Sequence, residues 1–126
     1  MRLLLDTHVV LWELGGLRTV RADARRAIAR ATELTFSVVS FAEIGVKAAI
    51  GKLEVPPDLQ DHVLRSGLRV LGLAPEHGLG VADLPIHHRD PFDRLLISQA
   101  RSEGLTIVTA DRRFAAYDVT VVDAAA

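Results

Sequence analysis

Short apolar runs alternate along the chain with longer stretches in which apolar residues recur at helical spacing. Five of the runs are rich in Leu, Val and Ile and lack a clean apolar–polar alternation. That pattern is typical of strands that are buried on both faces. It predicts strands at residues 2–5, 34–38, 70–73, 106–109 and 119–122.

The stretches between these runs carry helical patterns. Gly51 and Gly104 follow two of them, at the position where a helix commonly ends, and Pro56 and Pro57 open another segment. The pattern is weakest at residues 76–83 and strongest at residues 92–103. The predicted helical segments are residues 8–14, 22–31, 41–50, 58–66, 76–83, 92–103 and 112–117.

Alternation of strands and helices predicts an α/β domain with a mostly parallel sheet of about five strands. Right-handed crossovers would place helices on both faces of that sheet. The sequence contains no internal repeat, low-complexity tract or linker, so we expect one domain over residues 1–126. In such sheets ligands bind beyond the carboxyl ends of the strands.

Composition and charge exclude several kinds of metal site and binding mode. The 126 residues are 49% hydrophobic and 25% charged, with a net charge of −1 and no cysteine, so disulfides and thiolate metal sites are excluded. Bulk electrostatics would not hold this chain on nucleic acid, and any such role needs a local basic patch or a bound metal. No run resembles a signal peptide or a membrane helix, which makes a cytoplasmic location the expectation.

Four carboxylates stand where apolar runs end and helical patterns begin: Asp6, Glu43, Asp93 and Asp111. If the runs are parallel strands, all four side chains arrive at one edge of one sheet. Oxygen ligands without Cys, and without paired His at metal-ligand spacing, favour Mg²⁺ or Mn²⁺ over Zn²⁺. The pattern therefore indicates a metal site for phosphoryl transfer.

Each carboxylate also has a structural explanation. Asp6 and Asp111 can cap helices, Ser40 and Glu43 match the S-x-x-E capping box, and Asp90 before a proline reads as an N-cap. Capping leaves two features unexplained.

Asp93 shares a helical face with apolar residues and should be partly buried, which is costly without a partner. In addition, two carboxylates about 4 Å apart repel by roughly 4 kcal/mol at an effective dielectric near 20, which a divalent cation would offset. From the residues alone, capping and metal binding both stay open.

A family resemblance adds to this picture. In order along the whole chain, the sequence resembles PIN-domain ribonucleases of the VapC toxin type. The matching blocks are residues 3–8 (LLLDTH), 37–47 (SVVSFAEIGVK), 51–53 (GKL), 84–97 (LPIHHRDPFDRLLI) and 104–111 (GLTIVTAD). The resemblance implies a PIN-like three-layer α/β/α fold.

The resemblance also implies site residues. Asp6, Glu43, Asp93 and Asp111 match the family's acidic constellation, which holds one or two Mg²⁺ or Mn²⁺ ions, and Asp90 is a further candidate ligand. Thr109 matches a hydroxyl position that would hydrogen-bond a carboxylate or the attacking water. Some family members carry another acid or polar residue after the last acid. Here Arg112 and Arg113 stand there, so no ligand is assigned to that place.

The basic residues and histidines near these acids have two interpretations each. Arg94, Arg112 and Arg113 adjoin the acids and are candidates for contact with RNA phosphates, with plain ion pairing as the alternative. His87 and His88 lie in a polar loop, where we expect exposed side chains. Other basic and aromatic positions fit ordinary roles: Lys47 pairing with Glu43, and Trp12 in the core or a dimer surface.

The implied activity is hydrolysis of RNA phosphodiesters by a Mg²⁺- or Mn²⁺-dependent endoribonuclease, which would be the toxin of a type II toxin–antitoxin pair. The resemblance implies a homodimer and a cognate antitoxin that blocks the acidic pocket. Three rivals remain: a catalytically silent PIN-like binding module, a receiver-like signalling domain, and an aspartate-nucleophile phosphatase. The phosphatase needs an acid two residues after Asp6, where this chain has His8. The RNA and its cleavage motif cannot be read from the sequence.

Overall fold

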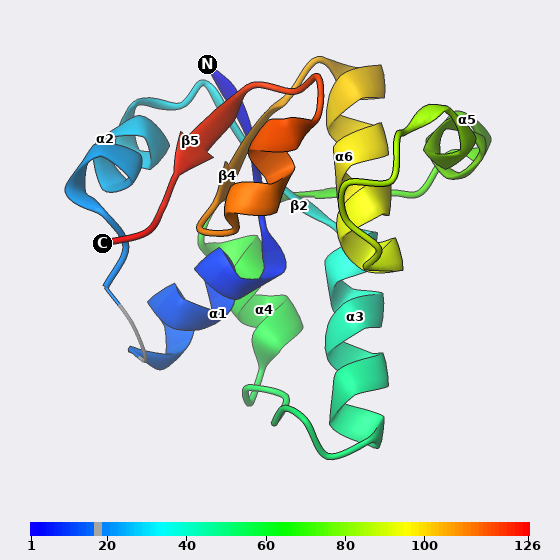
Figure 1. Ribbon diagram of the computed structural model, residues 1–126. Coiled ribbons are helices and arrows are strands. Elements are labelled where there is room, and N and C mark those ends of the chain that lie inside the picture. Colours follow the sequence, from blue (N-terminus) through cyan, green and yellow to red (C-terminus); the bar gives the residue numbers. More distant parts are fainter. Residues whose placement is uncertain (17–18) are drawn as a thin grey trace.

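A sheet of five parallel strands forms the centre of the molecule, as the computed structural model shows for residues 1–16 and 19–126 (Figure 1). The strand order is β3-β2-β1-β4-β5, and each neighbouring pair is parallel. The prediction of an α/β fold with a parallel five-stranded sheet is confirmed. The strands are β1 (Arg2–Leu5), β2 (Glu33–Ser37), β3 (Arg69–Leu71), β4 (Thr106–Thr109) and β5 (Val121–Asp123).

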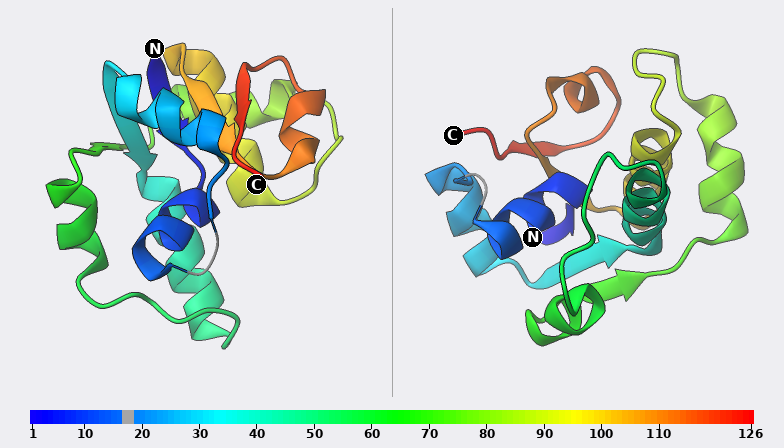
Figure 2. Two further views of the ribbon diagram at one scale, coloured as in Figure 1. Left: turned by 90° about the vertical axis from the view of Figure 1, so that its left-hand side faces the viewer. Right: turned by 90° about the horizontal axis from the view of Figure 1, so that it is seen from below.

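Helices connect the strands and cover both faces of the sheet. Seen from below, α1 and α2 lie on one side of the strands, and α5 and α6 lie on the other (Figure 2). The helices are α1 (Thr7–Gly15), α2 (Ala22–Arg30), α3 (Val38–Ala49), α4 (Leu59–Arg65), α5 (Pro75–Leu79) and α6 (Pro91–Glu103), with 3₁₀ turns η1 (Gly80–Asp83) and η2 (Arg112–Ala116).

Each face of the sheet buries its own apolar cluster. Leu3 and Leu5 of β1 pack with residues of α1, α2 and α4, whereas Leu4 between them packs with residues of α6 and η2. Adjacent side chains of a strand point to opposite faces, so β1 needs leucine at all three positions. The apolar runs therefore lack alternation because both faces are covered.

The second strand ends earlier than its apolar run suggests. Ser37 is the last residue of β2 and also the N-cap of α3, where its hydroxyl accepts a hydrogen bond from the Val39 amide at 3.0 Å. Helix α3 consequently starts at Val38, three residues before the predicted start. The S-x-x-E capping-box interpretation is wrong, because Ser40 and Glu43 both lie inside α3 and are buried.

Two edge strands and one helix also differ from their predicted bounds. β3 and β5 are three-residue strands at the edges of the sheet, displaced by one or two residues from the predicted runs. The helical pattern at residues 76–83 divides into α5 and η1. Gly80 stands at this junction, where an added Cβ would lie 2.7 Å from the Ser98 hydroxyl, so a larger residue would require Ser98 to shift.

All five strands run in one direction, so their carboxyl ends share the lower edge of the sheet in Figure 1. At that edge β1 leads into α1 and β2 into α3, while α6 begins nearby and contacts α3. Among the residues described, no helix is long and apolar enough to cross a membrane.

Candidate active site

A pocket of about 270 Å³ opens at the carboxyl edge of the sheet. Its lining comes from the starts of α1 and α6, from α3 and from the segment after β4 (Figure 1). Five carboxylates meet there although up to 105 positions separate them in the chain. The lining residues are Asp6, His8, Trp12, Glu43, Lys47, Asp90, Asp93, Ala110, Asp111 and Arg113.

Asp6 directly follows β1 and is 4% exposed. One carboxylate oxygen, Oδ2, accepts a hydrogen bond from the Thr109 hydroxyl at 2.8 Å. The other oxygen, Oδ1, is buried and has no hydrogen-bond partner among the described residues. Burial raises the pKa of Asp6 against the opposing effect of the Thr109 hydrogen bond. Asp6 occupies the N-cap position of α1, but its side chain bonds to Thr109 instead of capping the described helix.

Glu43 lies in the second turn of α3 and is 1% exposed. Both carboxylate oxygens have partners: the Thr7 hydroxyl donates to Oε1 at 2.7 Å, and the Lys47 ammonium lies 2.5 Å from Oε2. The Thr7 hydroxyl also lies 2.7 Å from the Ser40 hydroxyl. These contacts hold the Glu43 side chain toward the pocket.

Asp93 lies in the first turn of α6 and faces inward, as its place on the apolar face predicts. Its Oδ2 atom is 2.6 Å from Nε2 of His88, which is 5% exposed and also lies 3.7 Å from Asp111. Burial, reinforced by the charges of neighbouring acids, raises the pKa of Asp93 to about 8. Asp93 therefore holds its proton at far higher pH than an exposed aspartate does when no metal is bound.

The remaining two acids do cap local structure. Asp90 is the N-cap of α6, and its Oδ1 accepts hydrogen bonds from the Phe92 and Asp93 amides at 2.8 and 3.1 Å. Asp111 caps η2 by accepting from the Arg113 amide, and the Arg113 guanidinium forms a two-bond ion pair with it. This pairing lowers the pKa of Asp111. Both residues still line the pocket, so capping and pocket exposure coexist.

The donor atoms of the pocket fit a hard divalent cation. In each of two groups, Glu43 with Asp90 and Asp93, and His88 with Asp93 and Asp111, ligand atoms lie within 4.8 Å of one another. Asp6 lines the same pocket, and its buried Oδ1 has no hydrogen-bond partner among the described residues. Carboxylate oxygens with one imidazole suit Mg²⁺ or Mn²⁺. Burial is the first cause of the raised pKa values of Asp6 and Asp93, and the charges of neighbouring carboxylates add to it.

The three arginines named from the sequence lie in different environments. The Arg94 guanidinium donates to the carbonyl oxygens of four loop residues and to the Tyr117 hydroxyl, so its donors are used within the protein rather than offered to a phosphate. Its carbonyl partners are Val81, Leu84, Pro85 and His88. Arg112 and Arg113 are exposed at the start of η2.

The expectation for the two histidines is wrong for one of them. His87 is exposed, but its neighbour His88 is buried beside Asp93. The backbone amides of both residues donate to the hydroxyl of Tyr117, at 3.1 and 2.9 Å, and this fixes the loop that turns His88 inward. Tyr117 lies 29 residues away, so only the folded chain reveals this contact.

The fold agrees with comparisons to known proteins. Residues 3–119 match the PIN domain. The chain belongs to the PIN domain family. A curated PIN relative, Ribonuclease VapC22 of Mycobacterium tuberculosis, is 30% identical over 122 residues, covering 90% of each chain.

Solved structures share the PIN fold over nearly the whole chain. The VapBC2 complex of Rickettsia felis bound to promoter DNA has a TM-score of 0.74 at 16% identity, covering 98% of this chain and 99% of that one. The DNA-bound VapBC of Salmonella typhimurium has a TM-score of 0.71 at 18% identity and 98% coverage of both chains. FitAcB of Neisseria gonorrhoeae has a TM-score of 0.63 at 20% identity and 96% coverage of both.

Three buried residues of this PIN domain were not singled out as part of the site from the sequence. Thr7 and Ser40 lie one turn or less from Asp6 and Glu43 and form the hydroxyl pair beside Glu43. The sequence did carry a signal for both, because each is a small polar residue one to three positions before or after a predicted site acid. His88 carried no such signal, since the loop that buries it has no periodicity.

Proposed function

We propose that this protein is a Mg²⁺- or Mn²⁺-dependent endoribonuclease that hydrolyses RNA phosphodiesters. The observation that carries the proposal is the buried, unpartnered Oδ1 of Asp6, in the described structure, beside four more carboxylates in one pocket. An isolated carboxylate oxygen is costly to bury, and a cation removes that cost. The 30% identity to a ribonuclease over 90% of the chain supports the same activity.

The acids divide into direct and supporting roles. Asp6, Glu43, Asp93 and Asp111 are the proposed cation ligands, and Asp90 supplies a further oxygen while it caps α6. A bound divalent cation supplies Lewis-acid activation of water and of the phosphoryl oxygens. Thr109 holds Asp6 through its hydroxyl, Thr7 holds Glu43, and His88 holds Asp93. Such hydrogen-bonded partners orient ligands and keep them in place.

RNA would approach over the exposed side of the pocket. Arg113 lines the pocket and pairs with Asp111, Arg112 precedes it in the chain, and both side chains are exposed. Arginine contacts to phosphate position a nucleic acid without reading its sequence. We assign Arg112 and Arg113 to phosphate contact and Arg94 to holding the loop before α6.

The same fold suggests the biological setting. VapBC2 of Rickettsia felis is a complex, and a matched protein of Klebsiella pneumoniae is described as a toxin–antitoxin complex. We propose that this chain is the toxin of a type II pair, forms a homodimer, acts in the cytoplasm and is inhibited by a cognate antitoxin. Copurification with the product of the adjacent gene, followed by loss of RNA cleavage in the complex, tests this setting.

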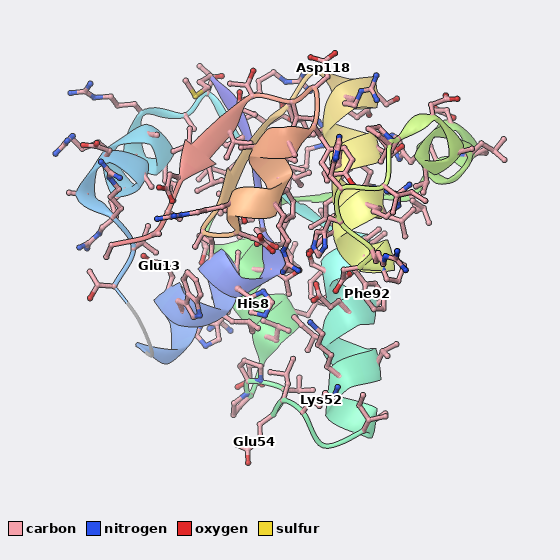
Figure 3. All side chains as sticks on the ribbon, in the orientation of Figure 1. His8, Glu13, Lys52, Glu54, Phe92 and Asp118 are labelled. Atoms are coloured by element: carbon pink, nitrogen blue, oxygen red, sulfur yellow. The ribbon has the colours of Figure 1, made fainter. Side chains whose placement is uncertain are left out.

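The deciding experiment is cleavage of an end-labelled RNA pool with Mn²⁺ or with EDTA. The wild-type protein should cut only with metal, and Asp93→Asn should reduce the rate by about a hundredfold or more, because it removes a charged ligand. Asp118→Asn is the matched control, since Asp118 is exposed at the opposite end of the molecule (Figure 3). It should cut like the wild type.

Three other results would count against the nuclease assignment. Equal cutting by wild type and Asp93→Asn means that the activity comes from another site or a contaminant. Cutting in EDTA excludes metal dependence. No cutting and no Mn²⁺ binding by calorimetry favours a catalytically silent binding module.

A further inference from the structure

Lys47 is a cation placed inside a cation-binding site. It lies on α3 four residues after Glu43 and lines the acidic pocket together with Asp90 and Asp93. An ion pair at this spacing on a helix is ordinarily a surface feature with both partners in water. Here Glu43 is 1% exposed and the Lys47 side chain 28% exposed, so the pair spans the boundary between the protein interior and the pocket.

The Lys47 ammonium lies beside the carboxylate oxygen of Glu43 that Thr7 does not bond. Glu43 has one oxygen bonded to Thr7, and Lys47 supplies the only charged partner that the described structure gives to the other oxygen. Although burial disfavours the ammonium, its hydrogen bond to Glu43 and the charges of Asp90 and Asp93 raise the pKa of Lys47. Lys47 is therefore charged and is attracted by three of the pocket acids.

The same three acids form one of the two candidate cation groups, with ligand atoms of Glu43, Asp90 and Asp93 within 4.8 Å of one another. A divalent cation and the Lys47 ammonium cannot share Glu43 without strong repulsion. One of them has to move. The four-carbon stem of lysine carries its charge on rotatable bonds, and the exposed part of Lys47 opens toward the pocket.

We propose that Lys47 is the resident counter-ion of Glu43 in the metal-free protein, that a divalent cation displaces its ammonium, and that the displaced ammonium then binds the RNA phosphate. This inference rests on the proposed metal site for the displacement and on the proposed RNA cleavage for its last step. It makes Lys47 a substrate-contacting residue with two opposite effects. Lys47 weakens metal binding by competition, and it strengthens cleavage by meeting the phosphate.

The sequence offers a direct way to observe the exchange, since Lys47 and Lys52 are the only lysines. Lys52 is exposed beyond the end of α3, next to Glu54 and away from His8 at the pocket (Figure 3). In protein labelled with ¹⁵N-lysine, the metal-free sample should show one ammonium signal protected from exchange with water, from Lys47. Saturating Mg²⁺ should abolish that protection and leave the Lys52 signal unchanged.

Substitution tests the two opposite effects. Lys47→Met keeps the apolar stem and removes the charge, so Mn²⁺ should bind about tenfold more tightly by calorimetry at pH 8. RNA cleavage at saturating Mn²⁺ should nevertheless fall by about tenfold or more. Lys52→Met makes the same change in net charge outside the pocket and should match wild type in both measurements.

Several outcomes overturn the inference. A protected Lys47 signal that persists when calorimetry shows the metal site full excludes displacement. Weaker Mn²⁺ binding in Lys47→Met, together with slower cleavage, makes Lys47 a structural support of Glu43. Because the labelling experiment uses wild-type protein, it decides the displacement even if Lys47→Met fails to fold.

The inference and the proposed function fail separately. Loss of Lys47 protection on Mg²⁺ binding in a protein that cuts no RNA supports the exchange and contradicts the nuclease. Metal-dependent cutting that is equal in wild type and Lys47→Met supports the nuclease and overturns the phosphate contact of Lys47.

Discussion

Two adjacent histidines show how one residue step changes the role of a side chain. His87 is exposed, whereas His88 is buried 2.6 Å from Asp93 and 3.7 Å from Asp111. Both backbone amides donate to the Tyr117 hydroxyl, and these bonds support the loop conformation that turns His88 inward. His88 therefore belongs to the site although its sequence environment resembles that of an exposed loop residue.

His88→Ala should lower metal-dependent RNA cleavage by about 10- to 100-fold, because it removes the group that orients Asp93. The matched variant His87→Ala changes the same residue type one position earlier and should keep the wild-type rate. Cleavage assays at saturating Mn²⁺ measure both. Equal rates in the two variants would show that Asp93 needs no orienting partner.

The protonation of Asp93 couples folding to pH. Its pKa is about 8 in the folded protein against an ordinary value of 3.8, so between these values the folded state holds a proton that the unfolded state has lost. The free energy of unfolding then decreases as pH rises, by up to about 1.4 kcal/mol per pH unit.

We expect urea unfolding in EDTA to show lower stability at pH 8 than at pH 5. Asp93→Asn cannot ionise and should flatten this slope, while Asp118→Asn should retain it. A slope that is the same in all three proteins would show that Asp93 is ionised in the folded state across this range.

At the scale of elements, the start of α3 determines where Glu43 points. Ser37 ends β2 and caps α3 at once, so Glu43 falls in the second turn and faces inward. A start three residues later would put the same residue in the first turn of the helix.

The loop before α6 is held in place by one side chain, because Arg94 donates to the carbonyl oxygens of residues 81, 84, 85 and 88.

Arg94→Met should destabilise the protein by about 2–3 kcal/mol, since it leaves loop carbonyl groups without their charged donor. Arg101→Met, on the exposed side of the same helix, should change stability by less than about 0.5 kcal/mol. Urea unfolding of both variants with wild type provides the comparison. If Arg94→Met instead kept full stability but weakened RNA binding, Arg94 would return to the phosphate-contact role.

At the scale of the whole molecule, the parallel sheet brings acids from four segments to one edge and leaves them short of positive charge. A cation that binds the folded state alone stabilises it by mass action, by about 2.7 kcal/mol at 100 times the dissociation constant. We therefore expect a bound divalent cation to offset the repulsion among these carboxylates.

Mn²⁺ or Mg²⁺ should therefore raise the melting temperature of the wild type, and EDTA should reverse the rise. Asp6→Asn should reduce the rise, because Asp6 contributes the buried oxygen that has no other partner in the described structure. Ca²⁺ titration serves as a test of size selectivity. An unchanged melting temperature with every ion would contradict a divalent metal site.

The sequence by itself determined the layers of the fold and which acids line the pocket at the carboxyl edge. The apolar runs place apolar side chains on both faces of each strand, which requires a parallel sheet covered on both faces. Helices that follow parallel strands begin at one edge of the sheet, which brings Asp6 and Asp111 together. The parallel α/β sheet and the carboxyl-edge pocket follow from local patterns, so they could be predicted.

Tertiary structure alone decided which contacts each site residue makes. The burial of His88 depends on Tyr117, the orientation of Asp6 on the hydrogen bond from Thr109, and the contacts of Arg94 on loop carbonyls. Asp6 and Thr109 are 103 residues apart, and hydrophobic periodicity cannot predict a contact between residues so far apart in the sequence. The pKa of Asp93 also required the fold, because it depends on burial and on the charges of neighbours that other segments supply.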